Sequence, residues 1–487
     1  MEARLDMQAK NMSRRGFLRA VGAGTVACAL PGALLGGPGK SSKPNVLFIA
    51  VDDLRPELGC YGQNHIVSPH IDRLANDGVV FNRAYCQSPV CGASRASLLS
   101  GIRATRDRSF KGYLHHADRD WGAPLSLPRH FRQNGYHTIS NGKIYHHRDD
   151  GKGSWSEPAW RPKGEWGGRG YLRPENIAIA REAERGLGPA YECADVGDSD
   201  YADGKTADKA ISDLRRLKDM DDPFFLAVGF VKPHLPFNAP KKYWDLYDAE
   251  KIDLADNPYR PKDAPDSAIH SWGELRAYHG IPKKGPLSDE MARKLIHGYY
   301  ASTSYTDAQI GRVLGELDRL GLRDDTIVVL WGDHGWNLGE HTLWCKHCHF
   351  QTSLLAPLIV RAPGLKGGAK TDALTEFVDI YPTLCELVGL SRPGHLEGRS
   401  FVPLMKNPNK SWKEAVYSRY QRGDSVRTDR YCYTEWTGKD GKRRARMLYD
   451  QKLDPDENVN ISERPENARL VAELAKKLHQ FRAGYVY

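Results

Sequence analysis

The stretch Asn45-Val46-Leu47-Phe48-Ile49-Ala50-Val51-Asp52-Asp53 decides the fold of this chain. The run up to Val51 is almost wholly apolar, which predicts a β-strand that is buried on both faces. Such strands belong to parallel sheets that helices cover on both sides. The run ends in two adjacent aspartates, and ligands of open α/β sheets bind beyond the carboxyl ends of the strands. The stretch therefore predicts an α/β fold with a polar site at the end of this strand.

Three more predicted strands are followed by charged or imidazole side chains: 137–140 by Lys143 and His146, 224–231 by Lys232 and His234, and 326–331 by Asp333 and His334. One such ending is unremarkable, since a cap or a surface turn explains it equally well. Four of them favour a shared site, because the carboxyl ends of parallel strands meet at one edge of a sheet.

The remaining pattern predicts the architecture around that edge. We expect a large central mixed, mostly parallel sheet flanked by helices, one of them from about residue 289 to 320. After residue 401, short β-type runs alternate with turns and predict a small antiparallel sheet, closed by a helix over 465–480. We divide the chain into a signal segment (1–40), a catalytic α/β domain (41–400) and a C-terminal subdomain (401–487). Residues 147–205 and 238–290 are expected to form long loops over the site.

The composition is that of a globular protein. Of the 487 residues, 27% are charged and 40% are hydrophobic, which excludes an intrinsically disordered chain. The formal net charge of +9 is compatible with a polyanionic substrate. No Lys/Arg run with interleaved aromatic residues is present, so we expect no nucleic-acid partner.

The N-terminus has the form of an export signal. Ser13-Arg14-Arg15-Gly16-Phe17-Leu18-Arg19 is a twin-arginine motif, followed by an apolar run over 20–35. Pro31 interrupts that run, which is too short for a stable membrane span. We predict the twin-arginine export machinery as a partner and a periplasmic location; a disordered basic terminus is the alternative. Cys28 lies in a poor lipoprotein box, so lipid anchoring there stays open but is disfavoured.

Nine cysteines are scattered without the spacing of a disulfide framework. Cys345-x-x-Cys348, which is flanked by His341, His347 and His349, is a candidate zinc site. No second Cys-x-x-Cys pair accompanies it, and structural zinc usually takes four ligands at set spacing. Zinc is therefore disfavoured.

A second stretch carries the chemistry: Cys91-Gly92-Ala93-Ser94-Arg95-Ala96-Ser97-Leu98-Leu99-Ser100-Gly101. It opens a predicted helix, with Arg95 one turn after Cys91 and on the same face. The free N–H groups of a first helical turn favour an anion. The stretch predicts an anion site beside a reactive side chain, although Cys-x-x-x-Arg alone also fits a buried cysteine and an exposed arginine.

The whole motif, Cys-x-Ala-Ser-Arg-x-x-x-Leu-Ser-Gly, resembles the signature of the sulfatase family, within the alkaline phosphatase-like superfamily. Ala93 and Ser100 depart from its commonest form, in which Pro and Thr stand there. In that family the cysteine is oxidised to formylglycine, which implies a formylglycine-generating enzyme as a partner acting on Cys91. The resemblance is strongest to the iduronate-2-sulfatase branch and includes residues 51–56, 59–62, 224–237 and 333–341.

The resemblance also implies the site residues. Calcium would be held by five side chains: Asp52, Asp53, Asp333, His334 and the modified Cys91. Carboxylate oxygens suit Ca²⁺ first and Mg²⁺ second, and the imidazole of His334 keeps the identity of the metal open. Six residues would be catalytic: Cys91, Arg95, Lys143, His146, His234 and Lys346.

These assignments imply hydrolysis of sulfate esters on a carbohydrate, a sulfated uronate or a polysaccharide. The nucleophile would be the diol of hydrated formylglycine, and the reaction would pass through a covalent sulfo-enzyme. A phosphonate or phosphate monoester hydrolase with the same nucleophile is one alternative. A non-catalytic protein that binds sulfated glycans is another.

Overall fold

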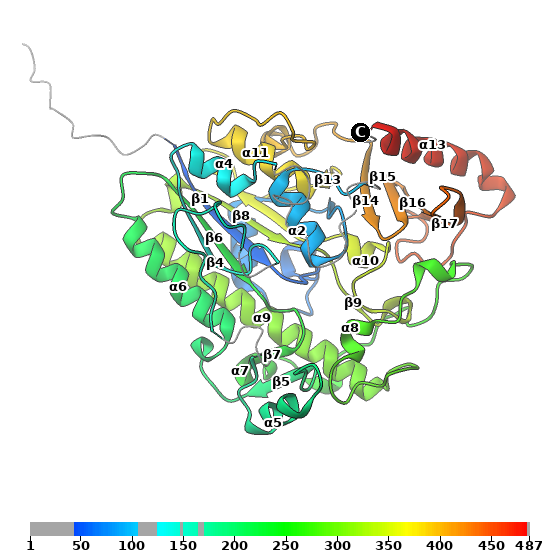
Figure 1. The fold of residues 1–487 in the computed structure, drawn as a ribbon, viewed down its shortest axis with the longest axis horizontal. Helices are drawn as coiled ribbons and strands as arrows, with labels where there is room; N and C mark the ends of the chain where they lie inside the picture. The colour runs from blue at the N-terminus through cyan, green and yellow to red at the C-terminus, as the bar shows by residue number, and fades with distance from the viewer. Residues whose placement is uncertain (1–42, 106–123, 147–149, 164–169, 485–487) are drawn as a thin grey trace, which may run out of the picture. The chain divides into compact units, whose positions relative to one another are not determined.

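The computed structural model describes residues 43–105, 124–146, 150–163 and 170–484 (Figure 1). Arg14, Arg15 and Cys28 lie outside these ranges, so the predictions made for them rest on the sequence alone. Residues 41–487 group into one compact unit, which is the unit described below. Within the described ranges, no helix combines the length and the apolar composition needed to cross a bilayer.

In the described residues the largest sheet has seven strands, in the order β12-β2-β11-β8-β1-β6-β4. Their bounds are Ala369–Thr371, Val79–Phe81, Leu358–Arg361, Thr326–Gly332, Asn45–Val51, Phe224–Phe230 and His137–Gly142. Strand β11 runs antiparallel to both of its neighbours, and all the other pairs are parallel. The predicted mixed, mostly parallel sheet is confirmed.

Strand β1 is buried on both faces, as its apolar run predicts. Its side chains alternate between two hydrophobic cores: Leu47, Ile49 and Val51 join one, and Val46, Phe48 and Ala50 join the other. Helices α1 (Pro69–Asp77), α6 (Ala202–Leu217) and α9 (Asp289–Arg319) contribute to the first core; α2 (Cys91–Ser100), α4 (Leu127–Gln133) and α11 (Ile380–Leu387) contribute to the second. Figure 1 shows α6 and α9 on one face of the sheet and α2, α4 and α11 on the other.

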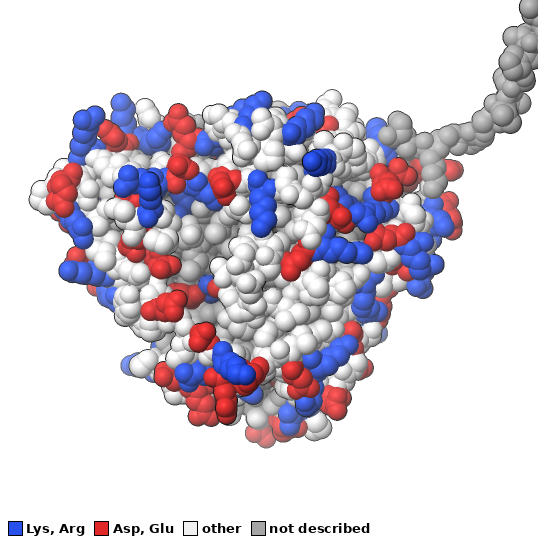
Figure 2. Space-filling view, turned by 180° about the vertical axis from the view of Figure 1, so that it is seen from behind, with Lys and Arg blue, Asp and Glu red and all other residues white. Residues whose placement is uncertain are grey.

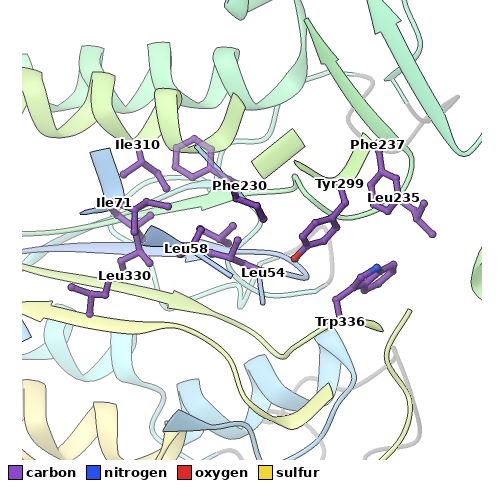
Figure 3. Close-up of a cluster of buried hydrophobic side chains, with 14 of the residues drawn as sticks. Leu54, Leu58, Ile71, Phe230, Leu235, Phe237, Tyr299, Ile310, Leu330 and Trp336 are labelled. Atoms are coloured by element: carbon purple, nitrogen blue, oxygen red, sulfur yellow. The ribbon is translucent and has the colours of Figure 1, made fainter. Parts of the chain in front are cut away.

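On the face of the sheet that α9 covers, the packed hydrophobic side chains continue as far as the ends of the strands. Figure 3 shows Ile310 of α9, Ile71 of α1 and Leu330 of β8 in this core, with Tyr299 and Trp336 nearer the end of the strands. The Tyr299 hydroxyl donates to the backbone carbonyl of Asp53 at 2.8 Å. The long helix predicted over 289–320 is therefore present, and it supports the turn in which the two aspartates lie.

The C-terminal part forms the predicted antiparallel sheet. Its four strands follow chain order as β14 (Ala415–Tyr420), β15 (Gly423–Thr428), β16 (Tyr431–Thr437) and β17 (Arg443–Asp450). Helix α13 (Ala468–Gly484) packs Leu474 and Leu478 against Val426 and Tyr433 of this sheet. Whether the chain divides into domains at residue 400 remains a prediction.

The expectation of unbroken long loops over 147–205 is wrong for the described part of that segment. It contains α5 (Pro174–Glu182), the strand β5 (Tyr191–Ala194) and the start of α6. Of the residues in α5 only Ala180 is buried, so the helix has no apolar stripe to reveal it in sequence. Strand β5 has four residues and pairs with β7 (Phe237–Pro240) from a distant segment.

Surface charge is mixed on the face opposite to the one in Figure 1. Figure 2 shows Lys and Arg interspersed with Asp and Glu there, without one large patch of a single sign. The net positive charge of the chain is therefore not concentrated on this face.

Candidate active site

Four neighbouring parallel strands deliver the predicted residues to one edge of the sheet. Strands β8, β1, β6 and β4 are adjacent and parallel, so their carboxyl ends coincide. Asp333 directly follows β8, Asp52 follows β1, and Lys143 follows β4. His234 lies four residues beyond the end of β6. The shared edge predicted from the sequence is present in the fold.

Helix α2 brings Cys91 to the same edge. Every residue of the helix is buried, and small residues such as Gly92, Ala93 and Ala96 let its backbone pack closely within the core. Val90, at the N-cap, provides no side-chain cap for the first turn. The N–H groups of that turn are thus left for an anionic partner.

Arg95 joins three strand ends and is not the exposed arginine that the short motif alone allows. Its side chain is fully buried. The Nε atom donates to Asp333 Oδ2 at 2.8 Å, and Nη2 donates to Asp52 Oδ1 at 3.1 Å. The Nη1 atom donates to the backbone carbonyl of Ile144 at 3.0 Å. One guanidinium therefore fixes the ends of β8, β1 and β4 relative to one another.

Asp52 is held in its ionised form. Lys143 Nζ donates to one carboxylate oxygen, and Arg95 Nη2 donates to the other. Burial raises the pKa of Asp52, but the charges of Lys143 and Arg95 outweigh burial and hold that pKa well below its usual range. A carboxylate that stays ionised in the interior can bind a cation without first losing a proton.

Asp53 carries negative charge that its neighbours neutralise only in part. Lys346 Nζ lies 3.2 and 3.1 Å from its two carboxylate oxygens. Burial nevertheless raises the pKa of Asp53 to about 7, with Lys346 lowering it and the nearby charge of Asp52 raising it. Adjacent buried carboxylates of this kind are relieved by an added cation.

His334 faces the same cluster with a defined nitrogen. Its Nδ1 lies 2.9 Å from the backbone carbonyl of Gly335, so that nitrogen carries the hydrogen. The Nε2 atom lies 3.2 Å from Cys91 Sγ, 3.4 Å from Asp53 Oδ1 and 3.7 Å from Asp333 Oδ1. A neutral imidazole oriented in this way can serve as a metal ligand.

The donor set fits a divalent cation. Ligand atoms of two overlapping groups each lie within 4.8 Å of one another: Asp52, Asp53, Cys91 and His234, and Cys91, Asp333 and His334. Three carboxylates favour a hard cation over zinc. No other such group occurs among the described residues. Cys348 instead lies with its Sγ 3.0 Å from Ser353 Oγ, in keeping with the argument against a zinc site.

The unmodified thiol of Cys91 is a poor nucleophile. Its side chain is fully buried, and burial together with the charge of Asp52 raises the pKa of the thiol well above its ordinary value. The thiolate is the reactive form of cysteine, so the thiol as it stands is unsuited to attack.

His234 and Lys346 both lie beside Asp53. His234 Nδ1 lies 2.6 Å from the carbonyl of Leu235, and its Nε2 lies 3.9 Å from Asp53 Oδ2. Burial and the charge of Lys346 lower the pKa of His234 to about 4. Lys232, which the sequence placed beside it, donates its Nζ to the carbonyls of His234 and Pro236 and so supports the loop.

His146 lies three residues beyond Lys143 in the loop after β4 and is partly buried. The structure brings the other nine predicted residues into one network, and the roles of all ten stay predictions.

One member of the network has no signal in the sequence. Glu274 lies in the short helix α8 (Gly273–Arg276), within the segment expected to form loops. Its Oε1 lies 3.0 Å from Lys346 Nζ and 3.1 Å from His234 Nε2. No motif or periodicity surrounds Glu274, so only the tertiary fold shows that it belongs here.

Comparison with known proteins agrees with this geometry. A family model described as sulfatase matches residues 44–390, and one described as N-sulphoglucosamine sulphohydrolase, C-terminal, matches residues 339–484. Iduronate 2-sulfatase of Mus musculus is 32% identical over 88% of this chain and 93% of its own length. The Homo sapiens protein of that name is 34% identical over 81% and 85%.

Among solved structures, a phosphonate monoester hydrolase from Silicibacter pomeroyi has a TM-score of 0.72 at 22% identity. The match covers 91% of this chain and 96% of that one, and it concerns the fold alone. The sulfatase model, by contrast, spans the sheet and all four strand ends. The chain belongs to the sulfatase family and is a sulfuric ester hydrolase.

Proposed function

We propose that this protein hydrolyses sulfate esters of a sulfated carbohydrate, a uronate or a polysaccharide, with formylglycine derived from Cys91 as its nucleophile. The observation that carries the proposal is the convergence of Cys91, Arg95, Lys143 and Lys346 at one buried sheet edge. Identity of 32–34% to two iduronate 2-sulfatases favours a carbohydrate substrate of that kind.

The proposed metal is Ca²⁺, with Mg²⁺ as the second choice. Its ligands would be Asp52, Asp53, Asp333, His334 and the modified Cys91, whose donor atoms form the compact cluster described above. When bound, such a cation supplies positive charge that acidifies a neighbouring hydroxyl and draws electron density from sulfate oxygens.

The side chains of this chain then have separate tasks. Arg95 holds the carboxylates of Asp52 and Asp333 in place, and Lys143 and Lys346 provide positive charge beside the sulfate oxygens. Two carboxylates thus stay ordered for the cation while two ammonium groups meet the anionic end of the substrate.

The reaction breaks the bond between sulfur and the sugar oxygen. One hydroxyl of the hydrated formylglycine would lose its proton to solvent and form a bond to sulfur. The electron pair of the broken bond would go to the sugar oxygen, which takes a proton from His234 or Lys346. In the second step the other hydroxyl loses its proton, with His146 as the proposed base. The aldehyde reforms as sulfate leaves, and water hydrates it again.

The proposed location is the periplasm, reached by the twin-arginine route after a formylglycine-generating enzyme has acted on Cys91. The support is the Arg14-Arg15 motif followed by a short apolar run. Replacing both arginines by lysine should leave the protein in the cytoplasm, as fractionation would measure. Unchanged export of that variant would contradict the assignment.

Sulfate release from a defined sulfated oligosaccharide tests the function directly. We expect activity in the native enzyme and loss of at least about 10⁴-fold for Cys91→Ala, since a covalent nucleophile is absent. The mass of the peptide that contains Cys91 should be that of the aldehyde. Faster hydrolysis of aryl phosphonates than of aryl sulfates would favour the phosphorus alternative, and a wholly unmodified thiol would favour glycan binding without catalysis.

A further inference from the structure

We propose that Glu274 is a positioning residue for the departure of the sugar oxygen, because it orients Lys346 and His234 together. The inference rests on the proposed function, in which those two side chains are the proton donors. Glu274 lies outside every motif that identified the site, and it comes from a segment distant in sequence from both partners.

One carboxylate contacts both donors. Glu274 Oε1 lies 3.0 Å from Lys346 Nζ and 3.1 Å from His234 Nε2, and its other oxygen lies 2.8 Å from the same Nζ. The ammonium and the imidazole are therefore held next to each other on the same acceptor. Two proton donors that share one acceptor are also directed to the same region of the site.

For Lys346, Glu274 balances the attraction of Asp53. The ammonium is fully buried and lies between the two carboxylates, with Asp53 oxygens at 3.1 and 3.2 Å. A lysine ammonium is a point charge on a flexible stem, so its position follows its partners. Without the charge of Glu274, Asp53 would be its remaining carboxylate partner in this network, and the ammonium would be drawn toward the acidic cluster.

For His234, Glu274 fixes the second ring nitrogen. The first, Nδ1, lies 2.6 Å from the carbonyl of Leu235. Both partners are acceptors, so the two contacts are hydrogen bonds together only when each ring nitrogen carries a hydrogen, which is the form in which the ring can donate a proton. In that form the ring cannot rotate about its side-chain bonds without losing a contact. The carboxylate therefore sets the direction of Nε2, the nitrogen that faces the site.

Helix α8 itself is well anchored, so Glu274 is held by rigid neighbours. Leu275 is 1% exposed and joins the core on the α9 face of the sheet. Arg276 stacks on the ring of Trp272, with 3.3 Å between its guanidinium carbon and the ring centroid. The Glu274 side chain is 18% exposed, whereas Lys346 is fully buried, so the carboxylate lies on the outer side of the ammonium.

The dependence of the rate on the leaving group tests this role. The measured quantity is kcat/KM for Glu274→Gln and native enzyme, on 4-nitrophenyl sulfate and on a sugar sulfate. A nitrophenolate departs without a proton, whereas a sugar alkoxide needs one. Displacement of Lys346 also weakens its contact with the sulfate oxygens, which lowers the rate on both substrates. General acid catalysis contributes about 10²–10⁴-fold, so we expect the loss on the sugar sulfate to exceed the loss on the aryl sulfate by at least about 10²-fold.

A matched control is Glu316→Gln, which removes a carboxylate paired with Arg215 and Arg319 near the C-terminal end of α9. We expect it to leave both rates unchanged. Glu274→Asp keeps the charge with a shorter reach, and should lose activity on the sugar sulfate by an intermediate factor. This second variant keeps the test informative where glutamine impairs folding.

If Glu274→Gln lowers kcat/KM by the same factor on both substrates and keeps native thermal stability, the positioning role is overturned. Glu274 would then only neutralise the charge of Lys346. A native enzyme that releases sulfate from neither substrate would overturn the proposed function instead. The two failures are therefore distinguishable in one set of measurements.

Discussion

Arg95 shows how strongly the side chains at this site depend on one another. Its guanidinium and the carboxylates of Asp52 and Asp333 have no solvent exposure. A buried charge is tolerated only while its partners compensate it, so the loss of one partner leaves the others unbalanced. The motif Cys-x-x-x-Arg thus supports the architecture as well as the chemistry.

Arg95→Met should lower the free energy of unfolding by about 3–5 kcal/mol, because Asp333 then loses its ionic partner in the interior. Urea unfolding followed by circular dichroism measures the difference. Arg73→Met is the control, since Arg73 is about half exposed and pairs with Asp318, and it should cost less than about 1 kcal/mol. Equal costs for the two variants would contradict the argument.

The ionisation of Glu376, which is not one of the proposed metal ligands, should make the stability of the folded protein depend on pH. Arg103 Nε lies 2.9 Å from one of its oxygens, and Lys413 Nζ lies 2.7 Å from the other. Burial raises the pKa of Glu376, but Arg103 and Lys413 outweigh burial and lower it from 4.5 to about 2. Because the folded-state pKa is the lower one, the stabilisation is fully present above about pH 4.5 and is lost as the pH falls toward 2.

Glu376→Gln should therefore be about 3 kcal/mol less stable than the native protein at pH 6, and the difference should shrink as the pH approaches 3. Urea midpoints at several pH values measure this difference. A difference that does not vary with pH would show that the charge of Glu376 is not the source of the effect.

Strands β4 and β6 approach each other closely at their carboxyl ends, where the site begins. A Cβ atom at Gly229 of β6 would overlap the backbone carbonyl of Lys143, so only glycine allows this register. The position of Lys143 is thus set by the pairing of two strands as well as by its ion pair with Asp52.

Gly229→Ala should cost about 1–3 kcal/mol of stability, as overpacking does, and should reduce sulfate release about 10- to 100-fold by displacing Lys143. Gly315→Ala is a matched control in helix α9, where an added Cβ meets nothing within 4 Å. That variant should be neutral or slightly more stable, because alanine favours the helix. Full activity of Gly229→Ala would contradict the steric argument.

The sequence predicts a strand or helix well when the hydrophobic pattern of that element's own residues identifies it. Strand β1 and its neighbours β6 and β8 are long and apolar, so their extents and polar endings were predictable. Strand β2 (Val79–Phe81) has three residues, and its place between β12 and β11 depends on partners far away in the chain. Glu274 was missed for the same reason, since its meeting with Lys346 arises from tertiary contacts alone.

The proposed cation would act on the molecule as a whole, since its ligands follow β1, β8 and the start of α2. Removal of the metal by a chelator should lower the melting temperature and abolish sulfate release, and Ca²⁺ should restore both more fully than Mg²⁺. A ligand at about 100 times its Kd stabilises by about 2.7 kcal/mol.

Calorimetry of the chelated and reloaded protein measures the shift. Asp333→Asn is the matched variant, because it removes one proposed ligand charge, and its melting temperature should respond weakly to Ca²⁺. An identical response of the variant and the native protein would place the bound cation elsewhere.

The full burial of Cys91 has a consequence for biosynthesis. A second enzyme must bring its own catalytic groups against the side chain that it converts, and in the finished fold no surface of this side chain is left for a second protein to contact. Under the proposed function, conversion must then precede closure of the sheet, and passage through a translocase for folded proteins must come last. A polypeptide that folds before Cys91 is converted would be exported with an unmodified thiol at residue 91.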